Sequence, residues 1–316
     1  MITIEDVRAA AERIGGSVVR TPLVPAPAQD PRRPLWIKPE NLQPTGAFKL
    51  RGATNAVARL GRGRGVITHS SGNHARALAF AASLVDLDAT VVMPANANPA
   101  KVDAVRALGA TVRLVPPQER EVAAETLADE LGLALVPPYD HADVMAGQGT
   151  IGLEIAADLP DVDVVLVPIG GGGLISGIAV AIKALCPRAK VIGVEPELAA
   201  DAAESLRRGE RTSWDVERVR RTIADGLRAI ELGRLTWPHV HRYVDDIVTV
   251  SDGQIAEAIR VLAAQFHQVA EPSGAVATAG YLSRADDLPA GRTVAVLSGG
   301  NIAPAVLAEI LLGGAG

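Results

Sequence analysis

Four consecutive glycines follow a mostly apolar segment, and this arrangement restricts the fold more than any other feature of the sequence. The glycines occupy positions 170–173, after the apolar residues 162–169 and before a helix-prone segment at 174–185. Residues without Cβ allow several backbone N–H groups to converge on one anion, and the start of the following helix adds its positive end. The pattern therefore predicts a strand, a phosphate-binding turn and a helix. ATP and NAD are poor candidates, because the turn lacks the lysine–serine ending of a P-loop and places Ile175 or Ser176 where G-x-G-x-x-G requires glycine.

Short β-prone segments alternate with helical ones along most of the chain, which is the pattern of an α/β protein with parallel sheets. Strands are predicted in two series, at 66–68, 89–93, 111–115 and 133–136, and then at 162–169, 191–194, 247–250 and 293–297. The most apolar of these strands are expected to be buried on both faces, between layers of helices. The clearest breaks in the pattern are 30–39 and 137–138, and a last helix is predicted at 303–312.

The first 14 residues predict a helix rather than a secretory signal. They include three acidic residues and lack a continuous apolar run, while Thr3 and Asp6 have the spacing of a capping box and Gly15 and Gly16 end the segment. No apolar run in the chain reaches the roughly 20 residues that a membrane-spanning helix needs.

Composition gives no reason to expect an electrostatic partner. The formal net charge is −5 over 316 residues, so neither nucleic acid nor an anionic membrane is an expected partner. The single cysteine, Cys186, cannot form an intrachain disulfide and is expected to be packed at a helix end. These features favour a reducing cytoplasm.

Two further glycine-containing turns follow predicted strands, and both carry polar side chains. The first contains Ser70, Ser71, Gly72, Asn73 and His74, and the second is Ser298-Gly299-Gly300-Asn301. Ligands of open parallel sheets collect beyond the carboxyl ends of the strands, so these turns and the four glycines are expected to share one crevice. His74 is interpreted as a helix-starting residue whose ring packs locally rather than as a base.

The segment 38–52, KPENLQPTGAFKLRG, contains Lys49. It resembles the Schiff-base lysine motif of the fold-type II pyridoxal-phosphate (PLP) enzymes, in particular the threonine/serine dehydratase and serine racemase family. That family also has a serine-serine-glycine-asparagine-histidine turn, a four-glycine phosphate loop and a late serine-glycine-glycine-asparagine turn, in this order. The segments 146–150, 222–226, 244–247 and 271–274 are similar as well, so the resemblance extends over nearly the whole chain.

The resemblance implies a tryptophan synthase β-like fold, with two open, mostly parallel twisted sheets flanked by helices and a site in the cleft between two lobes. A large cofactor-binding domain would comprise 1–60 and 144–316, and a small substrate-closing domain would comprise 61–143. Homodimers are typical of the family. A homodimer and a cytoplasmic location are therefore expected here.

The same resemblance implies roles for individual residues. Lys49 would bind PLP as a Schiff base and act as the catalytic base, with Ser71 on the opposite face of the cofactor. The other cofactor-binding residues would be Phe48 beside the ring, Asn73 at the 3-hydroxyl, Ser298 at the pyridine nitrogen, and Gly170, Gly171, Gly172, Gly173 and Leu174 at the phosphate. The substrate would be bound by Ser70, Ser71, Gly72, Asn73 and His74.

A metal site is also implied. In serine racemase-like enzymes a glutamate, a backbone carbonyl and an aspartate bind a divalent cation, and here they correspond to Glu195, the Ala199 carbonyl and Asp201. Mg²⁺, Ca²⁺ or Mn²⁺ would suit oxygen ligands of this kind. From spacing alone, a proline-started helix with an acidic first turn is the more frequent explanation. His239 and His241 have the spacing of a metal pair but no third ligand nearby, so they are interpreted as surface residues of a strand or loop.

The expected reaction is β-elimination, in which L-threonine or L-serine loses its hydroxyl and its nitrogen to give a 2-oxo acid and ammonia. The alternatives are a serine or aspartate racemase or a 3-hydroxyaspartate dehydratase and, more distantly, a non-catalytic PLP-binding or amino-acid-sensing protein. Asp143 is taken to stand where the racemase has an asparagine near the ring, and the segment 227–235 differs from the racemase pattern. Both departures favour dehydration over racemisation.

Overall fold

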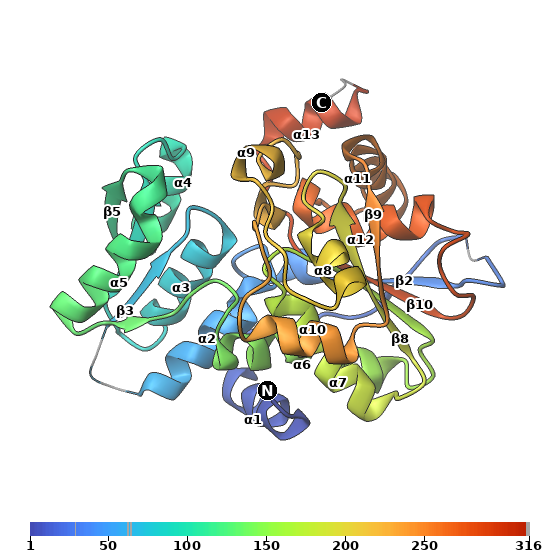
Figure 1. Cartoon of the computed structure of the whole chain (residues 1–316), viewed down its shortest axis with the longest axis horizontal. Coiled ribbons are helices and arrows are strands. Elements are labelled where there is room, and N and C mark those ends of the chain that lie inside the picture. Colours follow the sequence, from blue (N-terminus) through green and yellow to red (C-terminus); the bar gives the residue numbers. More distant parts are fainter. Residues whose placement is uncertain (29, 62, 64, 314–316) are drawn as a thin grey trace.

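The computed structural model describes residues 1–28, 30–61, 63 and 65–313, and it has two lobes, each built on a twisted sheet with helices on its faces (Figure 1). The strands are β1 (Val24–Pro25), β2 (Leu35–Pro39), β3 (Val66–His69), β4 (Ala89–Pro94), β5 (Thr111–Val115), β6 (Ala134–Leu135), β7 (Val164–Pro168), β8 (Lys190–Pro196), β9 (Asp246–Val250) and β10 (Thr293–Leu297). The predicted α/β class with two mostly parallel sheets is confirmed.

The α-helices lie between and around these strands. They are α1 (Ile4–Ile14), α2 (Lys49–Leu60), α3 (Asn73–Ser83), α4 (Pro99–Arg106), α5 (Arg120–Leu131), α6 (Ala142–Asp158), α7 (Gly173–Leu185), α8 (Asp201–Arg208), α9 (Val216–Val219), α10 (Thr236–Tyr243), α11 (Asp252–Phe266), α12 (Pro272–Ser283) and α13 (Pro304–Leu311). Three short 3₁₀ turns cover Glu40–Leu42, Pro117–Glu119 and Asp225–Leu227. Within the described ranges, none of the helices has both the length and the apolar character needed to cross a membrane.

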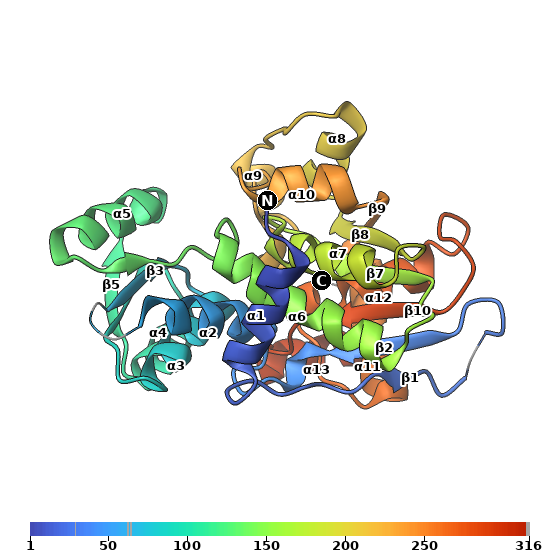
Figure 2. The same cartoon turned by 90° about the horizontal axis from the view of Figure 1, so that it is seen from below.

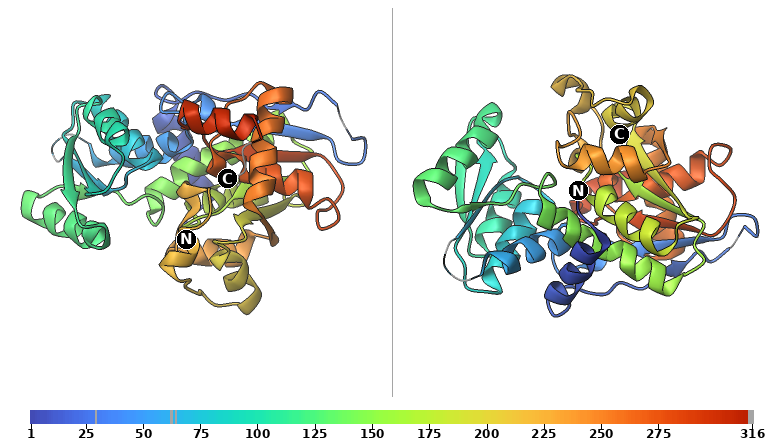
Figure 3. Two further views of the ribbon diagram at one scale, coloured as in Figure 1. Left: turned by 90° about the horizontal axis from the view of Figure 1, so that it is seen from above. Right: turned by 60° about the horizontal axis from the view of Figure 1, so that its bottom comes forward.

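The two sheets differ in size and in the part of the chain that forms them. The large sheet has the order β1-β2-β10-β7-β8-β9, and all of its neighbouring pairs are parallel except β1 with β2. The small sheet, β5-β4-β3-β6, is entirely parallel and comes from the middle of the chain. Figure 3 shows the small sheet and its helices as a separate blue-green lobe. The domain boundaries at 60/61 and 143/144 stay a prediction.

One sequence interpretation is wrong. The segment 30–39 was expected to be a break because of its prolines, but Leu35–Pro39 forms β2, which pairs in parallel with β10. Pro34 lies just outside the strand and Pro39 is its last residue, where a missing N–H is tolerated. The short apolar run of Leu35, Trp36 and Ile37 was the signal of a strand that the flanking prolines obscured.

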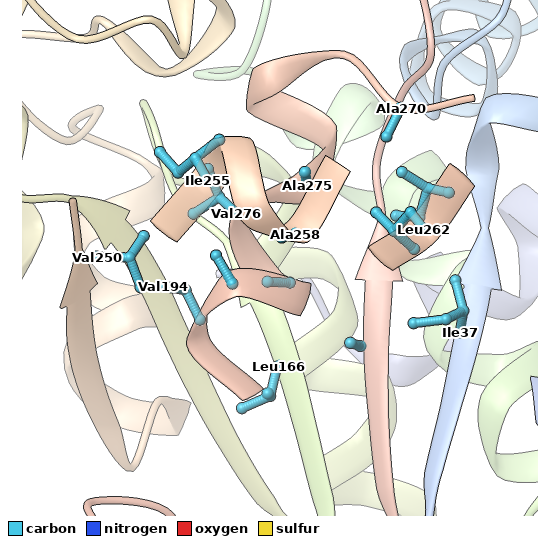
Figure 4. Packing of buried hydrophobic residues seen from close by; sticks show 14 of the residues in the cluster. Ile37, Leu166, Val194, Val250, Ile255, Ala258, Leu262, Ala270, Ala275 and Val276 are labelled. Carbon is cyan, nitrogen blue, oxygen red and sulfur yellow. The ribbon is translucent and has the colours of Figure 1, made fainter. Parts of the chain in front are cut away.

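The strand before the glycine turn shows why these apolar runs fold as they do. Along β7 successive side chains point to opposite faces. Val164 and Leu166 pack in the cluster under α11 and α12, while Val165 and Val167 pack in the cluster under α7. Figure 4 shows part of the first cluster, with Leu166 and Val194 from the sheet and Val276 from α12. A strand covered on both faces needs apolar residues at every position, as the sequence has.

Glycines let the helices at the lobe junction pack backbone to backbone. A Cβ at Gly147 of α6 would lie 2.6 Å from the Arg51 carbonyl oxygen of α2, and one at Gly177 of α7 would overlap the Met145 carbonyl of α6. Figure 2 shows α6 between the two lobes, with α1 lying across it. At the start of α1 both hydrogen bonds of the predicted capping box between Thr3 and Asp6 are present.

Candidate active site

The Lys49 segment is bound to the last strand–helix turn of the large lobe. Phe48 donates its backbone N–H to the Ser298 carbonyl at 3.0 Å, Gly300 donates to Gly46 at 2.9 Å, and Ala47 forms an antiparallel bridge with Gly299. Lys49 is then the first residue of α2. Two segments that are about 250 positions apart in the sequence therefore form one wall of a site.

The Lys49 amine lies in a desolvated place. Its Nζ donates a hydrogen bond to the Pro138 carbonyl at 2.5 Å and lies 5.1 Å from the centre of the Phe48 ring. Burial lowers the pKa of Lys49 to about 8, so a larger minority of the amine is neutral near neutral pH than for an exposed lysine. A neutral lysine amine is the form that condenses with an aldehyde or accepts a proton.

The four glycines form the turn that the sequence predicts. Gly172 has φ +89°, a conformation that side chains disfavour, and α7 begins at Gly173. The turn is held from outside, because Thr236 donates its hydroxyl to the Gly171 carbonyl at 2.7 Å and a Cβ at Gly171 would overlap the Tyr139 ring. The first N–H groups of a helix have no partner within it, so those of α7 are available to an anion. The turn fits a phosphate group.

The segment between the lobes links Lys49 to the glycine turn. The Pro138 carbonyl accepts a hydrogen bond from the Lys49 amine, and the next residue, Tyr139, packs on Gly171. Burial raises the pKa of Tyr139 to about 12, so its phenol stays neutral. Two consecutive residues thus hold the amine and the turn together, and no sequence motif indicated this contact.

The two aspartates of this segment have different partners. Asp140 Oδ1 accepts the Leu235 N–H at 2.7 Å, and so fixes the segment that precedes α10. Asp143, which was taken to lie near the cofactor ring, forms an ion pair with Arg59 of α2 at 3.2 Å. Within this segment, Tyr139 therefore contacts the glycine turn, and Asp140 contacts the residues before α10 that cover the turn.

Asn73, the first residue of α3, connects the small lobe to the large one. Its Nδ2 donates to Glu271 Oε1 at 2.6 Å, and its Oδ1 accepts from Asn301 Nδ2 at 2.8 Å. Arg76, one turn along α3, donates to Asn301 Oδ1 at 2.7 Å. Burial raises the pKa of Glu271 to about 7. Glu271 belongs to the segment 271–274, which resembled the family, but the sequence assigned it no role.

The serine turn lies at the same end of α3. Ser70 Oγ accepts the Gly72 N–H at 3.3 Å, and Ser70, Ser71 and Gly72 are all half-buried. His74 is buried, and its Nε2 lies 2.9 Å from the Val136 carbonyl. Burial lowers the pKa of His74 to about 3, so the ring is neutral. His74 is buried near the start of α3, but its ring bonds a segment 62 positions away rather than packing locally. The substrate contacts of this turn stay a prediction.

Ser298 is a buried residue directly after β10. Its hydroxyl donates to the Ser273 carbonyl at 3.4 Å, and its N–H donates to the Gly274 carbonyl at 3.3 Å. The predicted role of this hydroxyl opposite a pyridine nitrogen is chemically compatible with a neutral donor and acceptor.

Behind the lysine, a buried ion network fixes the start of α2. Arg51 forms two hydrogen bonds with Glu40, at 2.7 and 2.8 Å, and two with Glu154 of α6, at 2.6 and 2.9 Å. Lys38 also donates to Glu154, at 2.6 Å. Arg51, Lys38 and Glu40 are completely buried. Part of the lysine motif therefore serves to position Lys49 rather than to contact ligands.

The candidate metal ligands are buried carboxylates on neighbouring elements. Glu195 lies near the end of β8 and accepts the N–H groups of Ala202 and Ala203 at 3.1 and 2.8 Å. Neither carboxylate oxygen of Asp201 has a hydrogen-bond partner among the described residues. Burial raises the pKa of Asp201 to about 7, and burial together with Asp201 raises the pKa of Glu195. Two adjacent buried carboxyls require either a proton or a cation.

No group of three or more His, Cys, Asp and Glu side chains that could hold a metal ion is found in the part of the chain that the structure describes. The interpretation of His239 as a surface residue of a strand or loop is wrong, because it is buried in α10. Its Nε2 accepts the Ile2 N–H at 2.9 Å and its Nδ1 donates to the Leu235 carbonyl at 2.7 Å. His241 is exposed on the same helix and packs on Trp237. Cys186 is buried at the end of α7, as predicted.

A desolvated lysine joined to a glycine-rich anion turn, between two parallel sheets, defines the class of PLP-binding α/β proteins. Residues 14–299 match the model of a family described as pyridoxal-phosphate dependent enzyme, and the chain belongs to this family. It is 45% identical to an L-threonine ammonia-lyase of Thermotoga maritima, covering 96% of this chain and 76% of the relative. It is 41% identical to an L-threo-3-hydroxyaspartate ammonia-lyase of Saccharomyces cerevisiae, covering 95% and 93%.

The fold agrees with this assignment. A crystal structure of threonine deaminase from T.th. superposes with a TM-score of 0.91 at 41% identity, covering 96% of this chain and 99% of that one. The resemblance to the fold-type II PLP enzymes is thus confirmed.

Proposed function

We propose that this protein is a PLP-dependent ammonia-lyase that eliminates water from L-threonine or L-serine. Water then hydrolyses the released enamine to a 2-oxo acid and ammonia, so that the net products are the oxo acid and ammonia. One observation carries the proposal: the Lys49 amine, with its pKa lowered to about 8, is joined through Pro138 and Tyr139 to the glycine turn. The names of the relatives point to the same reaction class. When bound, PLP would withdraw electrons from the substrate Cα and so weaken its C–H bond.

The residues around this point suit that chemistry. Lys49 would bind the cofactor and, once released by the substrate amine, would take the α-proton at its neutral Nζ. Gly170–Gly173 and the start of α7 would bind the phosphate, with Phe48 beside the ring and Asn73 at the ring hydroxyl. Ser298, a neutral hydroxyl, would leave the pyridine nitrogen without a full positive charge, a setting that favours prompt loss of a β-leaving group.

The serine turn is suited to the substrate. Ser70, Ser71 and the N–H groups at the start of α3 would bind the substrate carboxylate, because a helix N-terminus attracts anions. The turn belongs to the small lobe, residues 61–143, so the small lobe would close on the substrate while the large lobe, 1–60 and 144–316, holds the cofactor. Ser71 would act on the face opposite Lys49.

Lys49→Ala tests the proposal, with Lys190→Ala as a matched control. Lys190 is half-exposed and forms an ion pair with Asp245. In the variant, Asp245 still has its second ion pair, with Lys183. Lys49→Ala should abolish turnover and the visible absorbance of the cofactor, whereas Lys190→Ala should keep both. Turnover that survives in Lys49→Ala would remove this residue from the reaction.

Product analysis decides between ammonia-lyase and racemase. L-Serine, L-threonine and both diastereomers of 3-hydroxyaspartate should be offered, with oxo acid and stereochemistry measured together. Oxo acid and ammonia from serine or threonine support the proposal. An inverted amino acid without oxo acid would show a racemase, oxo acid from 3-hydroxyaspartate alone would show a hydroxyaspartate ammonia-lyase, and no turnover despite bound cofactor would show an amino-acid sensor.

We also propose that Glu195, Asp201 and the Ala199 carbonyl bind a divalent cation, Mg²⁺, Ca²⁺ or Mn²⁺. The unpartnered buried oxygens of Asp201 support this. Because the folded pKa values of both carboxyls are raised, the metal-free protein should lose stability as pH rises from about 4 to 7. Mg²⁺ should restore it at pH 7, seen as a higher Tm. Asp201→Asn should abolish the Mg²⁺ response, whereas Asp246→Asn, on the exposed start of β9, should keep it.

The remaining expectations concern the setting of the enzyme. We propose a homodimer in the cytoplasm. Sedimentation of the purified holoenzyme would test the first point, and fractionation of the source cells would test the second.

A further inference from the structure

The side chain of Tyr139 lies along the four-glycine turn. A Cβ added to Gly171 would overlap the ring carbons Cδ2, Cε2 and Cζ of Tyr139, and a Cβ added to Gly173 would lie 2.9 Å from the Tyr139 Cβ. The ring therefore extends from Gly173, where α7 begins, back to Gly171. Because the phenol oxygen is bonded to Cζ, it lies at the Gly171 end, next to the candidate phosphate site.

This hydroxyl has no partner within the protein. No hydrogen bond joins the Tyr139 phenol oxygen to any residue in the described part of the chain, although the side chain is half-buried. The oxygen itself is not completely buried, so water or a ligand can reach it. A tyrosine that buries its ring commonly finds a hydrogen-bond partner for its hydroxyl. A bound ligand would supply the missing partner here.

The phenol is a hydrogen-bond donor at working pH. Burial raises the pKa of Tyr139 to about 12, and the nearby carboxylates of Glu121 and Asp140 add to this effect. The hydroxyl therefore keeps its hydrogen, which it can donate to an acceptor.

The donor is also held in place from both sides. Asp140, the next residue, accepts the Leu235 N–H at 2.7 Å, and the carbonyl of Pro138, the preceding residue, accepts the Lys49 amine at 2.5 Å. A group that is already fixed loses little freedom when it binds a ligand.

Other donors beside the turn are neutral or already used. A phosphate group has three strong acceptor oxygens, whereas the turn and the start of α7 offer backbone N–H groups. Residues 174–176, which follow the glycines, include no lysine. The Ser176 hydroxyl donates to the Thr236 carbonyl at 3.3 Å, and the Thr236 hydroxyl donates to the Gly171 carbonyl at 2.7 Å. Of these three hydroxyls, only that of Tyr139 is free to donate to a ligand.

We propose that the Tyr139 hydroxyl donates a hydrogen bond to the phosphate of PLP and so completes the phosphate site of the four-glycine turn. The inference rests on the proposed binding of PLP through Lys49, but not on which hydroxy-amino acid reacts. The ring of Tyr139 packs on the turn in either case, so the claim concerns the hydroxyl alone. A group that binds the phosphate should also bind inorganic phosphate, and it should make no difference to pyridoxal, which has none.

Tyr139→Phe removes the hydroxyl and keeps the ring on the turn. The matched control is Tyr243→Phe, which removes the hydroxyl of another half-buried tyrosine. Tyr243 is the last residue of α10 and Thr236 is the first, so it lies roughly 10 Å farther along this helix from the contact of Thr236 with the turn. Tm measurements of both variants check that the fold is kept.

Tryptophan fluorescence of the full-length apoproteins measures binding of three probes. These are PLP, pyridoxal, and inorganic phosphate as a competitor of PLP. Because a hydrogen bond to a charged group is lost, Tyr139→Phe should weaken PLP and inorganic phosphate by roughly tenfold or more and change pyridoxal by less than about twofold. Tyr243→Phe should leave all three affinities unchanged.

Three results would overturn the inference. An unchanged PLP affinity in Tyr139→Phe would show that the side chain only packs on the turn. Equal weakening of PLP and pyridoxal would show that the hydroxyl acts on the ring of the cofactor or on the fold. An unchanged PLP affinity with a raised KM for the amino acid would place the hydroxyl at the substrate. The proposed function fails by a different result, because native protein that binds PLP but forms no oxo acid would reject the ammonia-lyase activity and leave this inference intact.

Discussion

Arg51→Met should destabilise the protein far more than removal of any half-exposed arginine. Arg51 is completely buried and is the cation that both Glu40 and Glu154 contact. Methionine keeps much of the side-chain volume but leaves the Glu40 carboxylate buried without its guanidinium. Loss of one partner from a buried ion pair costs about 3–5 kcal/mol. For a chain of this length, that corresponds to a Tm lowered by roughly 5–10 °C.

The control and the rescue separate charge from packing. Arg59→Met removes a half-exposed pair with Asp143 and should cost about 1 kcal/mol or less. Adding Glu40→Gln to Arg51→Met removes the stranded charge and should recover roughly half of the loss. Thermal and urea unfolding of the cofactor-free proteins, followed by circular dichroism, measure these differences.

The pH dependence has a defined sign. Burial by itself would raise the pKa of Glu40, but the Arg51 guanidinium, together with Lys38 and the Thr21 hydroxyl, outweighs burial and lowers it. In the native protein this carboxylate therefore stabilises the fold above pH 4.5 and loses that effect as the pH falls. Without Arg51, burial raises the pKa of Glu40, so the stability deficit of Arg51→Met should be larger at pH 8 than at pH 5. A deficit that is small, independent of pH and unaffected by Glu40→Gln would refute this reasoning.

Three further predictions follow from single positions. Gly171→Ala places a Cβ in the Tyr139 ring and should lower PLP affinity by roughly tenfold or more. Gly16→Ala, where a Cβ meets nothing within 4 Å, should leave the affinity unchanged. Fluorescence titration of the apoprotein with PLP measures both affinities. Recombination of the apoprotein with PLP should speed up with pH and level off near pH 8, because burial lowers the pKa of Lys49 to about 8; a profile still rising above pH 9 would contradict this. Gly177→Ala should destabilise the fold by about 3 kcal/mol in urea unfolding, because its Cβ would overlap backbone of α6; a loss as small as that of Gly16→Ala would show that α6 and α7 can separate.

Local patterns in the sequence were sufficient to predict most of the secondary-structure elements. The eight predicted strands, the capped first helix and the glycine turn depend on residue type, side-chain period and near neighbours, which fold similarly in many contexts. β2 was missed because Pro34 and Pro39 gave a stronger local signal than the short apolar run between them. Its place in the sheet depends on pairing with β10, more than 250 positions away.

The sequence also indicated the class of site, because the motif around Lys49 and the four glycines between a strand and a helix resemble a known family. Only the tertiary structure decided which side chains meet. In the folded protein, Asn73 bonds Glu271 and His239 is buried in α10. Arg51, which belongs to the lysine motif, forms a buried ion network. The physical reason is that burial and charge compensation depend on which groups surround a side chain in three dimensions. A lysine loses its proton, or an arginine becomes indispensable, only when groups from distant segments exclude water around it.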